Sequence, residues 1–215
     1  MKKIIFIRPA PYSDRLLGKD LIVGFDLIGS QKYDPKVYVE DEITKERVNY
    51  LLKKFNPTKI YSSPAMRCVE TVKFFNSTFE ISPLLNEVKF SLKGTVSAKL
   101  LKGDNTNVNR LRKELINAFV ENKIEENPKE TLSRMKSFFE KLQNIDGNTI
   151  CISHAFIIKF YEIFFRNNGT IKNPSLFLTE HNWEIKPYEF MDGFCVSIAD
   201  TGKVQKVELL KDLFK

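Results

Sequence analysis

The hydrophobic positions of this chain alternate between two patterns. Short, nearly continuous apolar runs at residues 3–7, 59–62 and 149–152 are typical of strands that are buried on both faces of a parallel sheet. The segments between them repeat apolar residues at spacings of three and four, as amphipathic helices do. This alternation predicts an α/β fold with three layers, α/β/α, around a mostly parallel central sheet.

Five helical stripes are predicted to face the core. One helix is expected to start near Thr44 as its N-cap and to stop at Asn56-Pro57, and another to start with Ser63 as N-cap and Pro64 as first helical residue. The buried stripes are Val48, Leu51, Leu52 and Phe55; Ala65, Cys68, Val72 and Phe75; Val108, Leu111, Leu115 and Phe119; Leu132, Met135, Phe139 and Leu142; and Ile158, Tyr161 and Phe165.

Further strand signals surround these helices. Residues 79–82 predict a short strand, and residues 194–198 and 203–209 predict a closing hairpin around the turn at 200–202. Residues 11–40 are irregular, and residues 166–190 give the weakest pattern. A chain of 215 residues without repeats or long linkers fits a single domain, residues 1–215.

Polar residues follow three of the predicted strands. Arg8 ends the first strand, Arg67 lies in the first helical turn after the second, and His154 follows the third. In open α/β sheets, ligands bind outside the carboxyl ends of the strands, so these side chains are expected to converge. Arginine forks and a helix N-terminus both suit a phosphate group, so the sequence predicts an anion site there.

The segments Arg8-Pro9-Ala10, Ser63-Pro64-Ala65-Met66-Arg67 and Ser153-His154-Ala155 together resemble the signature of the histidine phosphatase superfamily, the phosphoglycerate-mutase-like proteins. The resemblance implies that Arg8 clamps the phosphate and that Arg67 is the arginine of the Ser-Pro-x-x-Arg helix start. It also implies that His154 is the second histidine, which is protonated in that family and stabilises charge on the transferring phosphoryl group.

Two further roles follow from the same resemblance. Glu87, in Leu85-Asn86-Glu87, is similar to the glutamate that protonates the leaving oxygen in the family. Arg15 falls about where many members place a phosphate-contacting asparagine. The residues at about 88–126 match the family's variable position for a helical insertion.

Pro9 is the main departure from the family pattern. In the family the first strand ends in Arg-His-Gly, and that histidine is the nucleophile, whereas here Pro9 and Ala10 occupy the last two positions. Proline has no lone pair with which to attack phosphorus. The resemblance therefore implies a phosphate pocket whose catalysis is lost or strongly impaired, by up to roughly 10⁶ in rate. His154 is expected beside the phosphate rather than in line with it, so it does not replace the nucleophile.

Each of these residues also has a structural interpretation. Arg8 can be a surface residue at a strand end, Arg67 an exposed helix residue bonded to a carboxylate, and His154 a cap for the following helix. Glu87 can be an ordinary loop glutamate, and Pro9 can simply terminate a strand. The joint pattern favours a shared anion site.

Three functional hypotheses remain open from the sequence. The first is a non-catalytic protein that binds phosphate or a phosphorylated small molecule, with at most weak phosphomonoesterase activity. The second is an active but atypical phosphomonoesterase or phosphomutase, with a variant in which Pro9 is an introduced substitution in an active parent. The third is an interaction module with a vestigial pocket. No pattern specifies the ligand or the oligomeric state.

Composition and short motifs bear on which partners, cofactors and membrane contacts are expected. The formal charge of +7 comes from scattered lysines, which favour a solvated surface over a nucleic-acid partner. No glycine-rich nucleotide loop, metal-ligand spacing or paired cysteine motif is present, so neither a cofactor nor a metal is expected. No apolar run approaches the roughly 18 residues of a membrane span, and none suits a signal peptide. These patterns predict a cytoplasmic protein with no membrane partner.

Overall fold

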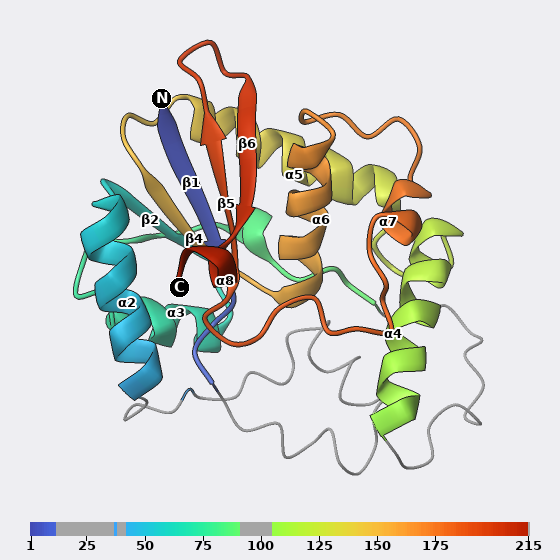
Figure 1. Cartoon of the computed structure of the whole chain (residues 1–215). Helices are drawn as coiled ribbons and strands as arrows, with labels where there is room; N and C mark the ends of the chain where they lie inside the picture. Colours follow the sequence, from blue (N-terminus) through green and yellow to red (C-terminus); the bar gives the residue numbers. More distant parts are fainter. Residues whose placement is uncertain (12–36, 38–41, 91–104, 215) are drawn as a thin grey trace.

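The computed structural model describes residues 1–11, 37, 42–90 and 105–214 (Figure 1). Within these residues one six-stranded sheet has the order β3-β2-β4-β1-β5-β6. The pairs β1–β4, β4–β2 and β2–β3 are parallel, whereas β5 runs antiparallel to both β1 and β6. The predicted mostly parallel sheet is confirmed. The strands are β1 Lys2–Ile7, β2 Lys59–Ser62, β3 Glu80–Ile81, β4 Thr149–Ile152, β5 Gly193–Ile198 and β6 Val204–Leu209.

Helices cover both faces of this sheet (Figure 1). Those described are α2 Glu42–Phe55, α3 Met66–Lys73, α4 Asn105–Val120, α5 Pro128–Gln143, α6 Ala155–Arg166, α7 Leu176–Thr179 and α8 Leu210–Leu213, with a 3₁₀ turn at Pro83–Leu85.

The alternation of side chains along β1 divides the core in two. Ile5 and Ile7 pack with buried residues of α2, α3 and α8 on one face. Ile4 and Phe6 pack with those of α4, α5, α6 and α7 on the other. Because successive residues of a strand point to opposite faces, one apolar strand supplies both cores, and three layers result.

Two expected N-caps differ from the structure. Thr44 is the third residue of α2 and is fully buried, because it continues the apolar stripe of Val48 by one more turn. Helix α3 begins at Met66 with Ala65 at its N-cap position, so Ser63 and Pro64 precede it. The backbone N–H of Ser63 instead donates to the carbonyl of Ile152 at 2.9 Å, and this hydrogen bond prolongs the sheet by one residue.

The stripes of two later helices also need correction. In α5, Phe138 is fully buried, whereas Phe139 is only half-buried and packs edge-on against Phe164 and Phe165. In α6, every residue from Phe156 to Phe165 is buried rather than a single stripe, because this helix lies between the sheet and other helices.

Three neighbouring strands end at the same level of the sheet. Ile152, the last residue of β4, pairs with Ile7 of β1 on one side and with Ser62 of β2 on the other. The residues that follow in each segment therefore leave the sheet side by side. They are Arg8, Ser63 and Ser153, and His154 comes directly after Ser153.

Candidate active site

His154 is enclosed by the fold and contacts a polar group through each ring nitrogen. Its side chain is 4% exposed. Its Nδ1 lies 2.7 Å from Nη2 of Arg67, and its Nε2 lies 2.8 Å from Oγ of Ser63. The same Nε2 lies 3.8 Å from Sγ of Cys68. Helix α3 therefore presents both a guanidinium and a thiol to the imidazole.

The surroundings of His154 are strongly positive. Burial lowers the pKa of His154 well below its ordinary value of 6.5, and the charges of Arg67, Arg8 and Arg134 lower it further. Arg67 is itself 2% exposed, so little solvent screens its charge. The structure therefore keeps this imidazole neutral at neutral pH.

Arg8 is held at the tip of β1 by the segment of residues 188–192. Its Nη1 donates to the carbonyl of Tyr188 at 2.7 Å, and its Cζ lies 4.6 Å from the centre of the Phe190 ring. Its backbone N–H donates to the carbonyl of Asp192 at 2.9 Å. Its Nε is buried and has no hydrogen-bond partner within the described residues.

Pro9 and Ala10 tie the strand tip to two other segments. The carbonyl of Pro9 accepts from the backbone N–H of Met191 at 3.3 Å. The backbone N–H of Ala10 donates to Oγ1 of Thr71 at 2.9 Å, and that hydroxyl donates to the carbonyl of Arg67 at 2.7 Å. Thr71 thereby connects the tip of β1 to the turn of α3 that carries Arg67.

Glu87 lies at the start of α6 and caps it. Its Oε2 accepts from the backbone N–H of Phe156 at 3.2 Å, and its Oε1 accepts from those of Ile157 at 2.9 Å and Val88 at 3.0 Å. Burial raises the pKa of Glu87 above its ordinary value, against the three backbone donors and Arg67, which favour its ionised form. His154 holds the N-cap position of α6 but makes no side-chain cap, so the alternative interpretation of this residue as a helix cap is wrong.

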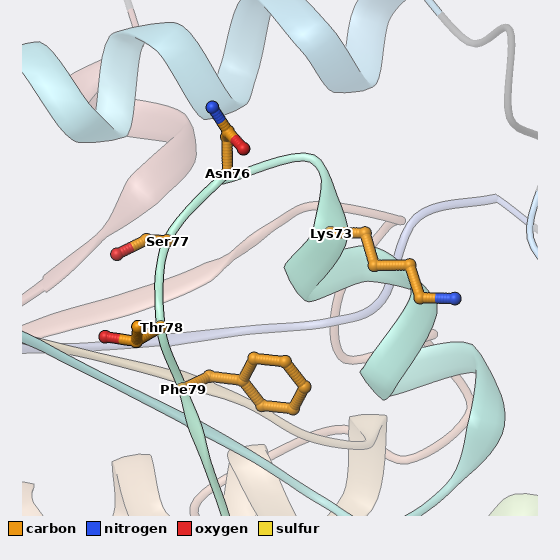
Figure 2. Close-up of a pocket in the computed structure, with 5 residues that line it drawn as sticks. All are labelled: Lys73, Asn76, Ser77, Thr78 and Phe79. Carbon is orange, nitrogen blue, oxygen red and sulfur yellow. The ribbon is translucent and has the colours of Figure 1, made fainter.

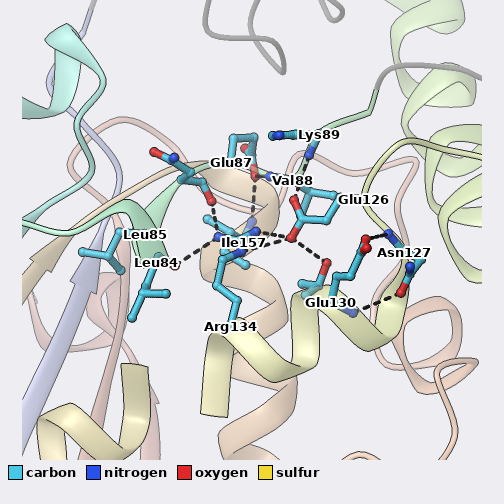
Figure 3. A network of polar contacts seen from close by, with 12 residues as sticks. Leu84, Leu85, Glu87, Val88, Lys89, Glu126, Asn127, Glu130, Arg134 and Ile157 are labelled. Atoms are coloured by element: carbon cyan, nitrogen blue, oxygen red, sulfur yellow. Dashed lines mark hydrogen bonds and ion pairs between the residues drawn. The ribbon is translucent and has the colours of Figure 1, made fainter. Parts of the chain in front are cut away.

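The loop that carries Glu87 is fixed by a polar network around Arg134 of α5 (Figure 3). Arg134 donates through Nη1 to the carbonyls of Leu84 and Asn86, at 3.0 and 2.6 Å. Its Nε and Nη2 contact Oε1 of Glu126 at 3.0 and 2.7 Å. Two half-buried charges therefore connect this loop to the first turns of α5.

A match to a protein-family model shows which family this chain belongs to. The model of the histidine phosphatase superfamily (branch 1) matches residues 34–166, more than half of the chain. The chain belongs to the histidine phosphatase superfamily. The matched residues include Arg67, Glu87 and His154 and begin after Arg8 and Pro9. A search of curated proteins found no match.

Solved structures share the fold of this superfamily member along nearly the whole chain. A mutant phosphoserine phosphatase from Entamoeba histolytica in complex with phosphoserine is 17% identical, with a TM-score of 0.60 and 97% of each chain covered. A putative alpha-ribazole-5'-P phosphatase from Escherichia coli is 13% identical, with a TM-score of 0.59 and 97% of each chain covered. A phosphoglycerate mutase from Bacillus anthracis is 12% identical, with a TM-score of 0.58, over 95% of this chain and 90% of that one.

The structure of this histidine phosphatase superfamily member brings together four of the five site residues that the sequence predicts. Arg67 and His154 are in direct contact, and Arg8 lies close enough to lower the pKa of His154. Glu87 caps helix α6, which begins directly after His154, and the charge of Arg67 favours the ionised form of Glu87. Arg15 and nearly all of residues 11–40 lie outside the described residues.

Several residues around the site were missed by the sequence patterns. The local sequence predicts Ser63 to be a helix cap, whereas its hydroxyl contacts His154, and Tyr188 and Phe190 fall in the stretch with the weakest pattern. Thr71 had a usable signal, because it lies four residues after Arg67 on one helix and so shares its side. The others depend on contacts between distant parts of the chain.

A separate surface hollow of about 620 Å³ is lined by Lys73 and residues 76–79 (Figure 2). It lies at the C-terminal end of α3, whereas Arg67 is in the first turn, and it includes none of the predicted site residues. Among the described residues, no three or more His, Cys, Asp or Glu side chains gather as metal ligands would. No helix in the described ranges has the length and apolar character to cross a membrane.

Proposed function

We propose that this chain is a histidine phosphatase family protein that binds a phosphate or phosphoester and whose catalysis is lost or strongly impaired. The observation that carries the proposal is the guanidinium of Arg8. It is 7% exposed, its Nε has no hydrogen-bond partner in the part of the chain that the structure describes, and the buried salt bridges found there involve other cations.

A buried guanidinium without a counter-ion is costly, by several kcal/mol per ion in general terms. The structure meets part of this cost with a carbonyl and an aromatic ring, and the carboxylate of Glu189 lies near enough to interact with the Arg8 charge. A phosphate dianion supplies an acceptor for Nε of Arg8 and further negative charge beside its guanidinium. Arg67 adds a second guanidinium in the first turn of α3, where the helix N-terminus also favours an anion.

The class of ligand is a phosphorylated small molecule. Two of the similar solved structures are described as phosphatases, one of them in complex with phosphoserine, and a third as a phosphoglycerate mutase. These descriptions belong to those proteins, and they support a phosphate monoester as the ligand here. We also propose that the chain is one domain in which residues of about 88–126, including α4, form an insertion.

Impaired catalysis follows from Pro9. The resemblance assigns the nucleophile to this position, and a proline can neither attack phosphorus nor accept a phosphoryl group. Arg8 and Arg67 can still position a phosphoester, and phosphoryl transfer depends mainly on positioning and electrostatics. Slow hydrolysis by water is therefore compatible with the proposal, whereas turnover through a phosphohistidine is not.

Anion binding is tested by sulfate at constant ionic strength, with Arg8→Ala and Arg110→Ala compared. Arg110 is an exposed arginine of α4 that pairs with Glu114, so it serves as the matched control. A bound ligand stabilises by RT ln(1 + [L]/Kd), and about 1 kcal/mol raises Tm by about 2–4 °C in a chain of this size. We expect millimolar sulfate to stabilise the wild type and Arg110→Ala but not Arg8→Ala. Equal shifts in all three proteins would contradict a site at Arg8.

Catalysis is tested by phosphate release from a panel of phosphoesters by the wild type and Pro9→His. For the wild type we expect a rate of phosphate release orders of magnitude below that of a normal phosphatase, with no acid-labile phosphoryl group on histidine. Fast turnover that is lost in Arg8→Ala would instead favour the active, atypical phosphomonoesterase. Absence of any sulfate effect together with absence of turnover would favour the interaction module.

A further inference from the structure

We propose that His154 acts as a neutral hydrogen-bond acceptor that positions the Arg67 guanidinium, and that Ser63 and Asn86 fix the tautomer that this requires. The family resemblance implies a different role, in which this histidine is protonated and stabilises phosphoryl charge. The inference deepens the proposed anion site, on which it rests for its effect on ligand binding.

The contact between Arg67 and His154 determines the state of Nδ1. A guanidinium carries only donors and stays protonated in proteins, so the nitrogen 2.7 Å from Nη2 must offer a lone pair. An imidazolium has an N–H on both nitrogens, and it would place one of them against the N–H of Arg67. The observed distance is therefore compatible only with a neutral ring whose proton lies on Nε2.

The other side of the ring supplies the acceptor that this tautomer needs. Nε2 lies 2.8 Å from Oγ of Ser63, which accepts its proton. The hydroxyl of Ser63 then donates to Oδ1 of Asn86 at 3.2 Å, and this amide oxygen can only accept. Arg134 holds Asn86 through its backbone carbonyl at 2.6 Å. The hydrogen bonds thus run in one direction, from Arg67 through His154 and Ser63 to Asn86.

The same direction excludes an activated serine. A serine within hydrogen-bond distance of a histidine is the usual arrangement of a nucleophile and its base. Here Nε2 carries the proton, because Nδ1 accepts from Arg67, so His154 has no lone pair for the hydroxyl of Ser63. Ser63 is also fully buried, which keeps substrate phosphorus away from its oxygen.

The charged groups around His154 act in the same sense. Arg67 of α3, Arg8 after β1 and Arg134 of α5 are all cations, and each opposes a positive imidazole. The nearby acid, Glu87, is committed to backbone donors at the start of α6, and Cys68 offers only a weak sulfur contact. Because His154 is neutral, the positive charge that the Arg67–His154 pair offers to an anion is that of Arg67.

The tautomer can be measured directly, because the chain has only two histidines. Long-range ¹H–¹⁵N correlation spectra of the wild type, recorded from about pH 5 to about pH 8, report the protonation of each ring nitrogen. His181 gives an internal reference, because its Nε2 donates to the carbonyl of Ile185 and its pKa is lowered to about 4. We expect His154 to remain neutral and protonated on Nε2 throughout. A doubly protonated ring near pH 6, or a proton on Nδ1, would overturn the inference.

A second measurement separates a positioning role from a cationic one. Sulfate remains a dianion over this pH range, so its Kd reports only changes in the protein. We expect the wild-type Kd to be unchanged from about pH 5 to about pH 8, to rise about tenfold in His154→Phe, and to stay within about threefold in His154→Gln, whose amide oxygen can accept from Arg67.

The outcomes distinguish this inference from the proposed function. A doubly protonated His154 ring accompanied by tighter sulfate binding as the pH falls, or equal losses in both variants, would show a cationic role and overturn the inference while the anion site stands. A wild type that binds no sulfate would overturn the proposed function, and the ring spectra would still decide the state of His154.

Discussion

Arg8 shows how individual residues far apart in the sequence define the site. The carbonyl of Tyr188 accepts from its guanidinium, and the ring of Phe190 covers it. The segment of residues 188–192 is strained just after Phe190, because Met191 has a φ of 55°, a left-handed conformation that costs a non-glycine residue about 1–2 kcal/mol. Side-chain anchors must therefore hold this segment: Tyr188 donates its hydroxyl to Glu162, and Arg47 donates to the carbonyl of Phe190 at 2.7 Å.

A first prediction concerns the hydroxyl of Tyr188. Glu162 also binds Lys159 and Arg166, so Tyr188→Phe removes one buried hydrogen bond to a charged group and leaves the others. We expect the free energy of unfolding to fall by about 1.5–3 kcal/mol and the sulfate Kd to rise several-fold, because the carbonyl beside Arg8 loses its anchor. Urea unfolding and calorimetric titration measure the two effects.

Tyr161→Phe is the matched control for that variant. Tyr161 is a fully buried tyrosine of α6 whose hydroxyl has no hydrogen-bond partner within the described residues. Removal of this hydroxyl is expected to leave stability unchanged or slightly raised, and to leave sulfate binding unchanged. Similar losses in both variants would indicate a general effect of tyrosine replacement rather than an anchor for Arg8.

At the scale of elements, the start of α6 is formed by two residues with divided roles. His154 occupies the N-cap position but uses its ring for Arg67 and Ser63, and Glu87 supplies the capping oxygens from a separate loop. The loop is in turn bound to α5 through Arg134 (Figure 3). The ring of His154 can therefore contact Arg67 and Ser63 because Glu87 accepts the hydrogen bonds of the first backbone N–H groups of α6.

The capping role gives a second prediction. Glu87→Ala removes the carboxylate that accepts from the backbone N–H groups of Phe156, Ile157 and Val88, so we expect the free energy of unfolding to fall by about 1–3 kcal/mol. Glu125→Ala is the control, because that glutamate forms an exposed pair with Lys89, and its loss should cost at most about 1 kcal/mol. Denaturant unfolding that shows no difference between the two variants would contradict the capping role and leave Glu87 as a purely functional group.

At the scale of the whole molecule, the sequence predicts the framework well and the details of the site less well. Strands β2 and β4 lie where their apolar runs indicate, because burial on both faces leaves an unambiguous pattern. The prediction for Ser63 is wrong because its local sequence favours a helix cap, whereas its hydroxyl contacts His154 from a distant part of the chain. Tyr188 contacts Arg8 across 180 residues of sequence, and no local periodicity encodes such a contact.

The central claim is that one anion is bound between Arg8 and Arg67 beside His154. Crystals soaked in tungstate, a heavy analogue of phosphate, test it most directly, because anomalous scattering locates the metal atom without ambiguity. We predict one strong peak whose oxygens lie within hydrogen-bond distance of Nε of Arg8 and of the Arg67 guanidinium, with no covalent bond to the protein. Tungstate bound elsewhere, with these two guanidinium groups left uncontacted, would contradict the account.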